Sequence, residues 1–258
     1  MKHRRITWLP IIVAALCFIG TTSCQQEQDA WDRIQESGIL RVGLDPTYPP
    51  FEVLAADGVA GIDVDLAQAI AKDLGLRVEF TYFGYDGLYD ALATNQVDVL
   101  ASALVISIDK FRDFAYTTSY FNAGQVLVSR TDFPHKDPAS LVGSTLAVEL
   151  GAQGHVEAAI WERQIHELEI MPFASTTEAL EALSRGDADA ALVDHIGALV
   201  HRDQDSSLVI GPDLVTEEPF ALVVLAGQEE LLDVLNESLV KMSEDNQLQI
   251  ILDRWLGK

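Results

Sequence analysis

The chain has 258 residues, with 17 basic and 40 acidic side chains and a formal net charge of −23. A protein this acidic repels nucleic acid and anionic lipid headgroups, because both are negatively charged, so we expect neither as a partner. Its hydrophobic content of 48% allows one large domain or two small ones, and no segment after the N-terminal region has the length and apolarity of a membrane span.

The first segment has the layout of an export signal. Lys2, Arg4 and Arg5 form a basic start, and a short apolar core follows over residues 11–19. This core is shorter than the roughly 20 apolar residues that a membrane helix needs. A basic start, a short apolar core and small residues after it are typical of a cleaved signal peptide.

Cys24 follows a run of small residues and precedes a polar stretch. These surroundings resemble those of the lipidated cysteine in bacterial lipoproteins. The resemblance implies a signal peptide over residues 1–23, a lipidated linker over residues 24–36, and a membrane-anchored lipoprotein that carries its lipid on Cys24. An ordinary secretory signal cut nearby is the alternative. Both interpretations place the mature protein outside the cytoplasm, in the periplasm or at the cell surface.

Strand-like and helix-like segments alternate along the rest of the chain. Helices are predicted where apolar residues recur at helical spacing, with Asp63 and Ser107 as two expected caps, and strands where short apolar runs occur. The pattern predicts strands over 39–44, 77–83, 97–103, 125–128, 145–150, 168–172, 188–193 and 220–225, and helices over 63–74, 85–95, 107–114, 154–164, 176–185 and 229–256, the last broken near 245–246. The alternation favours an α/β fold with mostly parallel sheets, and its restart after residue 138 indicates two lobes.

Six short segments carry distinctive sequences. They are GILRVG at 38–43, DPTYPPFE at 45–52, GIDVDL at 61–66, NQVD at 95–98, RGDADA at 185–190 and WLG at 255–257. In this order and spacing they resemble the family 3 extracellular solute-binding proteins, the receptors of polar amino acid ABC transporters. The resemblance extends over nearly the whole chain from residue 38 to residue 258.

The resemblance implies the periplasmic-binding-protein type II fold. This is an α/β fold of two lobes, each with a mixed sheet covered by helices on both faces, joined by a two-strand hinge. Lobe 1 is then expected over residues 37–123 and 221–258, and lobe 2 over residues 124–220. The ligand is expected between the lobes, which close because it contacts both of them. A transmembrane ABC permease would recognise the closed form.

The resemblance also implies a site for a small ligand with an amino group, such as an amino acid. Asp194 matches the acid that holds the α-ammonium group, and it ends a strand, where α/β sheets place ligands. It could also cap the helix that follows. Asp45 matches a residue that faces the ligand, or is a turn residue before Pro46. Tyr48 and Tyr85 match two aromatic residues that enclose the ligand, and their rings suit an ammonium group.

The carboxylate side of the site departs from the family pattern. The residues expected there or beside it are Ala103, Val105, Lys110, Glu149, Gly151, Ala152 and Gln153. Lys110 stands where the family has an arginine, so the charge is kept and the planar two-pronged grip is lost. Val105 and Ala152 stand where the family has hydroxyl groups, although backbone N–H groups near residues 151–153 can still bind an anion. Glu149 makes the cleft more acidic, or is simply an exposed strand end.

The sequence therefore predicts an extracytoplasmic receptor of an ABC importer for an amine-bearing, amino-acid-like ligand. We expect no catalytic residue, metal ion or cofactor, because the histidines lack metal-ligand spacing and no Gly-rich phosphate loop occurs. The alternative is an enzyme on the same fold that resembles cyclohexadienyl or arogenate dehydratases, with Glu149 beside Lys110 as proton donor. Its dianionic substrate fits poorly into an acidic cleft, which favours the receptor.

Overall fold

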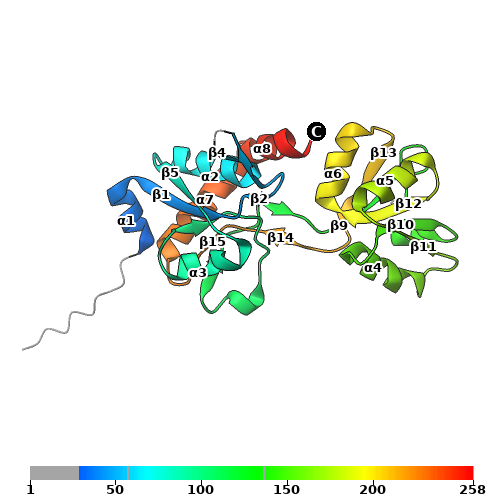
Figure 1. The fold of residues 1–258 in the computed structure, drawn as a ribbon, viewed down its shortest axis with the longest axis horizontal. Helices are drawn as coiled ribbons and strands as arrows, with labels where there is room; N and C mark the ends of the chain where they lie inside the picture. Colours follow the sequence, from blue (N-terminus) through cyan, green and yellow to red (C-terminus); the bar gives the residue numbers. More distant parts are fainter. Residues whose placement is uncertain (1–28, 57, 136, 258) are drawn as a thin grey trace, which may run out of the picture.

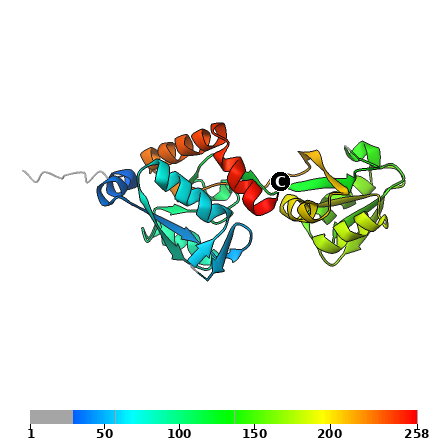
Figure 2. The same ribbon diagram turned by 90° about the horizontal axis from the view of Figure 1, so that it is seen from above.

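The computed structural model describes residues 29–56, 58–135 and 137–257. The expected signal peptide and the lipidation site Cys24 lie outside these residues. Figures 1 and 2 show two lobes arranged along the long axis of the molecule. In the described ranges, no helix is both long enough and apolar enough to cross a membrane.

Lobe 1 contains a five-stranded mixed sheet of order β5-β1-β6-β15-β7. Its strands are β1 (Ile39–Leu44), β5 (Arg77–Tyr82), β6 (Val99–Leu100), β7 (Phe114–Tyr116) and β15 (Val223–Leu225). β1 runs parallel to β5 and β6, whereas β15 runs antiparallel to β6 and β7. Because β15 comes from near the end of the chain, lobe 1 consists of two segments that are far apart in the sequence, as the colours of Figure 1 show.

Helices cover both faces of this sheet. They are α1 (Ala30–Ser37), α2 (Ile62–Asp73), α3 (Leu88–Ala93), α7 (Glu229–Glu244) and α8 (Gln247–Leu256). Successive strand residues point to opposite faces, and Val223 accordingly packs in the cluster with α3 while Val224 packs in the cluster with α2 and α7. Because both faces of the sheet are buried, successive residues of its strands are apolar, which explains the continuous apolar runs in the sequence.

Lobe 2 repeats this architecture with the order β11-β10-β12-β9-β13. Its elements are β9 (Gln125–Arg130), β10 (Thr145–Glu149), α4 (Gln153–Glu162), β11 (Glu169–Phe173), α5 (Thr176–Arg185), β12 (Ala190–Asp194), α6 (His195–Gln204) and β13 (Leu208–Leu214). β10 is parallel to β11 and β12, and β9 is antiparallel to β12 and β13. Leu192 packs with Trp161 of α4 and Val193 with Leu180 of α5, so helices again cover both faces. The predicted fold class is confirmed.

Two short strands connect the lobes. β8 (Phe121–Asn122) pairs antiparallel with β14 (Pro219–Phe220), inside the ranges 120–124 and 216–220 that the family resemblance implies for the hinge. The Asn122 side chain ties the two strands together, because its Oδ1 accepts hydrogen bonds from the N–H groups of Gly124 at 3.1 Å and Glu218 at 2.8 Å. A Cβ atom on Gly124 would lie 1.8 Å from the carbonyl oxygen of Thr216, so the strands pass too closely for any side chain there.

Smaller elements complete lobe 1 and the connection into lobe 2. A three-stranded sheet contains β2 (Thr47–Tyr48), β3 (Glu52–Ala55) and β4 (Gly58–Ala60), and the short 3₁₀ helices are η1 (Tyr85–Gly87), η2 (Ile108–Lys110) and η3 (Pro138–Leu141). The break expected near residues 245–246 is confirmed, since Asn246 has a φ of 61° between α7 and α8.

The expected linker and one expected cap are corrected by the structure. Residues 30–36 belong to α1, which packs on lobe 1 through Ile34 at 1% exposure; a helix this short leaves little periodicity in the sequence. Asp63 does not cap α2, because Gly61 holds that position with a φ of 143° and no side-chain cap. The Asp63 carboxyl is instead buried and accepts the N–H of Ala103 at 2.6 Å.

Three further segments differ from the prediction. The helix expected over 107–114 is only the single turn η2, because the chain enters β7 at Phe114. The Ser107 side chain does not cap this turn, contrary to the prediction. The strand expected over 97–103 is reduced to β6, since Ala103 has a positive φ of 44°. The strand expected over 220–225 divides into β14 in the hinge and β15 in the sheet.

Candidate functional site

A pocket of about 370 Å³ lies on lobe 1 beside the hinge. It is lined by Asp45, Thr47, Tyr48, Glu52, Tyr85, Ser102, Ala103, Val105, Glu218 and Phe220. The structure thus brings together Asp45, Tyr48, Tyr85, Ala103 and Val105 of the expected site. The two tyrosines are 46% and 58% exposed, which leaves their rings available to a ligand.

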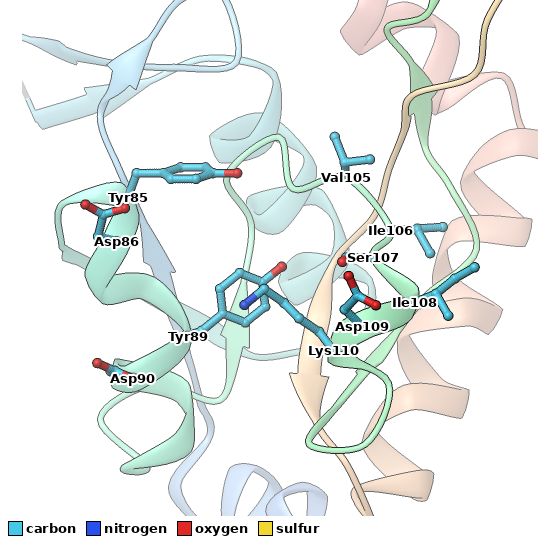
Figure 3. A pocket seen from close by; sticks show the side chains of 10 residues that line it. All are labelled: Tyr85, Asp86, Tyr89, Asp90, Val105, Ile106, Ser107, Ile108, Asp109 and Lys110. Carbon is cyan, nitrogen blue, oxygen red and sulfur yellow. The ribbon is translucent and has the colours of Figure 1, made fainter.

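A second, larger pocket of about 850 Å³ adjoins the first and shares Tyr85 and Val105 with it (Figure 3). Lys110 lies here, with its Nζ 4.0 Å from the ring centroid of Tyr89, which is a cation–π contact. The Tyr89 hydroxyl lies 3.0 Å from that of Tyr116, and burial is the main cause that raises the pKa of Tyr89. The lysine expected at the carboxylate side therefore rests on an aromatic ring beside the first pocket.

Lobe 2 places two carboxylates at the ends of neighbouring strands. Glu149 ends β10 and Asp194 ends β12, and these two strands are parallel. The hydroxyl of Thr176, at the start of α5, lies 2.8 Å from Glu149 Oε2 and 2.9 Å from Asp194 Oδ2. Asp194 Oδ1 also accepts the N–H of Gly197 at 2.7 Å, so Asp194 does cap α6. Asp194 thus caps α6 through Oδ1, while its Oδ2 lies beside the Thr176 hydroxyl.

The N-terminus of α4 offers fewer free N–H groups than expected. Ala152 is the N-cap and Gln153 begins the helix. Gly151 donates its N–H to His155 Nδ1 at 3.1 Å, and Ala152 donates to the carbonyl oxygen of Glu149 at 3.2 Å. Two of the three backbone donors expected to face an anion therefore have intramolecular acceptors, and Gln153 remains for that role.

Five residues that line the first pocket were not predicted as site residues: Thr47, Glu52, Ser102, Glu218 and Phe220. Glu218 lies just before β14, and Ser102 lies just after β6. Neither matches a ligand position in the resemblance, and a lone acid in a polar stretch carries no periodic signal. Thr176 was likewise missed, because a threonine before an apolar helix reads as part of the helix start.

A family model for bacterial extracellular solute-binding proteins, family 3, matches residues 40–258. The chain belongs to this family. The membership expected from the sequence motifs is confirmed.

Individual relatives of this solute-binding protein agree with the assignment. It is 29% identical over 232 residues to the L-cystine-binding protein TcyJ of Escherichia coli (strain K12), covering 88% of this chain and 85% of that protein. It is 27% identical to the arginine-binding extracellular protein ArtP of Bacillus subtilis (strain 168), covering 96% of this chain and 97% of that protein. The solved structure of an ancestral cationic amino acid solute-binding protein matches with a TM-score of 0.68 and 29% identity, covering 88% of this chain and 100% of that one.

The solute-binding protein carries negative charge on both sides of its first pocket. The pKa of Tyr48 is raised, first by burial and then by the charges of Asp194 and Glu218. The pKa of Glu218 is raised by burial and by the charge of Asp194. Asp194 on lobe 2 thus acts electrostatically on residues that line the lobe 1 pocket. No residue of β10, β12, α4 or α5 lines that pocket, so its lining comes from lobe 1 and the hinge.

Proposed function

We propose that this protein is the receptor of an ABC importer and binds a small amine-bearing, amino-acid-like ligand between its lobes. The observation that carries the proposal is the set of carboxylates around two exposed tyrosines. Asp45 and Glu218 line the pocket with Tyr48 and Tyr85, and Asp194 acts on it from lobe 2. Carboxylates and aromatic faces together favour a cation. The names of the cystine-binding and arginine-binding relatives support the same ligand class.

Each expected residue has a role in this proposal. Asp194 accepts hydrogen bonds from the ligand's ammonium group through Oδ2, the oxygen that lies beside the Thr176 hydroxyl. Tyr48 and Tyr85 enclose the ligand, and Lys110 and the N–H of Gln153 take its carboxylate. Lys110 Nζ lies over the ring of Tyr89, and no ion pair of the described residues includes it, so its charge is available to a ligand.

Binding is completed by rotation about the hinge. We propose that residues 37–123 and 221–258 form one rigid lobe and residues 124–220 the other. Since the lobe 1 pocket and the pair of Glu149 and Asp194 belong to different lobes, a ligand that contacts both stabilises the closed arrangement. The closed form would then be recognised by a transmembrane permease.

In this proposal, the N-terminal region brings the receptor to the membrane that holds its permease. A signal peptide over residues 1–23 directs export, and a lipid on Cys24 anchors the receptor at the membrane, outside the cytoplasm. Because α1 begins at Ala30, the anchor and the folded lobe are separated by only a short polar stretch.

We propose a binding protein and not an enzyme. A dehydratase of the alternative kind must bind a dianion, whereas Asp45, Glu218 and Asp194 present negative charge to the pocket. The hydrogen bonds of Glu149, the proton donor of that alternative, also argue against the enzyme. Glu149 Oε2 accepts hydrogen bonds from both the N–H and the hydroxyl of Thr176, at 2.9 and 2.8 Å, so this oxygen is already engaged within lobe 2.

A thermal-shift screen of the mature protein tests the proposal. The panel contains L-arginine, L-lysine, L-cystine, L-glutamine, putrescine and prephenate. A ligand at one hundred times its Kd stabilises the folded state by about 2.7 kcal/mol, which gives a clear shift. We expect an amine-bearing compound to raise the melting temperature and prephenate to leave it unchanged. A shift with prephenate, accompanied by its turnover in a spectrophotometric assay, would favour the enzyme.

A further inference from the structure

Two buried carboxyl groups, those of Glu52 and Asp63, are neighbours at the lobe 1 pocket, because the N–H of Asp63 donates to the carbonyl oxygen of Phe51 at 3.0 Å, directly before Glu52. Glu52 begins β3 and lines the pocket, and Asp63 lies in the first turn of α2. Glu52 is 1% exposed to solvent and Asp63 is 0% exposed. In the part of the chain that the structure describes, neither carboxyl pairs with a lysine, arginine or histidine. Two adjacent buried charges without a cation are strongly unfavourable.

Their hydrogen bonds leave one oxygen of each carboxyl without a partner. Ser102 donates its hydroxyl to Glu52 Oε1 at 2.7 Å, and Ala103 donates its N–H to Asp63 Oδ2 at 2.6 Å. The remaining oxygens, Glu52 Oε2 and Asp63 Oδ1, are fully buried and have no hydrogen-bond donor among the described residues. A proton on one of the carboxyls supplies the missing donor, because a protonated carboxyl donates one hydrogen bond.

We propose that Glu52 and Asp63 share one proton in the folded protein, which Glu52 donates to Asp63, and that this pair positions Ser102 and Ala103 in the ligand pocket. Two adjacent buried carboxyl groups do not both ionise, because their negative charges repel each other. One of them therefore keeps its proton at a pH well above the usual pKa of a carboxyl group. The shared proton is the one that an isolated glutamate releases at neutral pH and that Glu52 retains in the folded protein.

The surroundings identify Glu52 as the protonated member. Asp63 accepts the N–H of Ala103, a donor that favours its ionised form, whereas the buried Tyr120 hydroxyl has no hydrogen-bond partner among the described residues. Glu52 faces Asp63 and, farther off, Asp45, and both charges favour its neutral form. Burial and the charge of Asp63 raise the pKa of Glu52 to about 10, whereas burial raises that of Asp63 to about 6.

The pair connects two parts of the pocket. Ser102 Oγ donates to Glu52 and accepts the N–H of Asp45 at 2.9 Å, so Glu52 fixes the backbone that carries Asp45. Ala103 has a φ of 44°, which is strained for a residue with a side chain, and its N–H is held by Asp63. Glu52 and Asp63 are therefore positioning residues, since they act on the ligand through Asp45, Ser102 and Ala103.

Infrared spectroscopy tests the shared proton without any ligand. At pH 7, the difference spectrum between the mature wild-type protein and Glu52→Gln contains the carbonyl stretch of a protonated carboxyl, which shifts in D₂O. The matched control is Glu79→Gln, which changes an exposed glutamate on β5 and gives no such band. If the band is missing from the Glu52→Gln difference spectrum, Glu52 is ionised and the shared proton is refuted.

Two conservative variants test the positioning role. Glu52→Gln keeps an N–H donor toward Asp63 and an oxygen for Ser102, so we expect the amide exchange rate of Ala103 and the Kd for L-arginine or L-cystine to stay within threefold of wild type. Glu52→Asp keeps the acid but is one methylene too short, so we expect Ala103 to exchange at least tenfold faster and the bound probe to dissociate at least tenfold more readily. Wild-type values in both variants would overturn the positioning role.

The binding readout rests on the proposed function, and the other two readouts do not. If the wild-type protein binds neither probe, the proposed ligand class fails, while the infrared band and the exchange of Ala103 still decide the inference. If the wild type binds a probe but the infrared band is absent, the inference fails and the proposed function stands.

Discussion

Glu149 and Asp194 share a single hydroxyl group. Thr176 Oγ1 lies within hydrogen-bond distance of Glu149 Oε2 and Asp194 Oδ2, at 2.8 and 2.9 Å. A hydroxyl carries one hydrogen and donates it to one acceptor at a time. One carboxylate oxygen of the pair is therefore always left without this donor. An ammonium group carries several N–H donors, so this arrangement is complementary to the ligand that we propose.

Replacing Thr176 tests this arrangement. Thr176→Val removes the hydroxyl that holds both carboxylates in position, and a loss of positioning worth about 1 kcal/mol predicts roughly fivefold weaker binding of L-arginine. Thr176→Ser keeps the hydroxyl and is expected to bind like the wild type in isothermal titration calorimetry. Equal affinities for the valine and serine variants would contradict a role for the hydroxyl.

Lys110 is expected to bind the carboxylate of the ligand. Lys110→Met removes the charge that rests on Tyr89, and a lost charged hydrogen bond of about 1.5–3 kcal/mol predicts about 10- to 150-fold weaker binding of L-arginine. Agmatine, which has the same side chain but no carboxylate, provides the comparison. Its affinity should not fall in the variant. A loss of the same size for both compounds would place Lys110 elsewhere in the recognition.

The hinge depends on the absence of a side chain at Gly124. A Cβ there would meet the carbonyl oxygen of Thr216 at 1.8 Å, so Gly124→Ala must push the two hinge segments apart beside β8 and β14. Overpacking of this kind costs about 1–3 kcal/mol, and urea denaturation is expected to show it. Gly84→Ala is the control, because a Cβ at Gly84 meets no atom within 4 Å. A variant at Gly124 as stable as this control would be inconsistent with the close approach.

The buried pair predicts how stability depends on pH. Glu52 has its pKa raised from 4.5 to about 10, so between these values the folded state holds a proton that the unfolded state has released. The free energy of unfolding must therefore fall as the pH rises, by at most about 1.4 kcal/mol per pH unit. Glu52→Gln removes this proton, so its stability relative to wild type should increase steadily from pH 5 to pH 9 in urea denaturation. Parallel stability curves for the two proteins would show that Glu52 does not titrate in this way.

Local pattern predicted the elements whose periodicity is strong. The strand at 39–44 and the helix at 176–185 have the predicted bounds, because apolar spacing defines both elements and Ser175 and Gly186 cap the ends of the helix. Asp63 shows where this reasoning stops. A short acid before an apolar run reads as a helix cap, and only the tertiary structure turns its carboxyl inward toward Ala103. The strand over 97–103 is shortened for a similar reason, since no local pattern reports the positive φ of Ala103.

The candidate site residues were predicted from the family resemblance, and their binding roles stay predictions. The strand-end positions of Glu149 and Asp194 follow from the α/β pattern, and the structure places both beside Thr176. Glu218 and Ser102 reach the pocket only because the hinge and the end of β6 bring them there, and such long-range contacts leave no trace in a single sequence.

Asp194 carries the central claim, because it is the residue proposed to bind the ammonium group. Asp194→Asn removes the charge but keeps a side chain that caps α6, so the folded structure should be retained. Isothermal titration calorimetry with the tightest-binding amine of the screen compares the two proteins. Loss of about 2 kcal/mol or more from a buried charge pair predicts at least about thirtyfold weaker binding at an unchanged melting temperature. Equal affinity of the wild type and the asparagine variant would contradict the account.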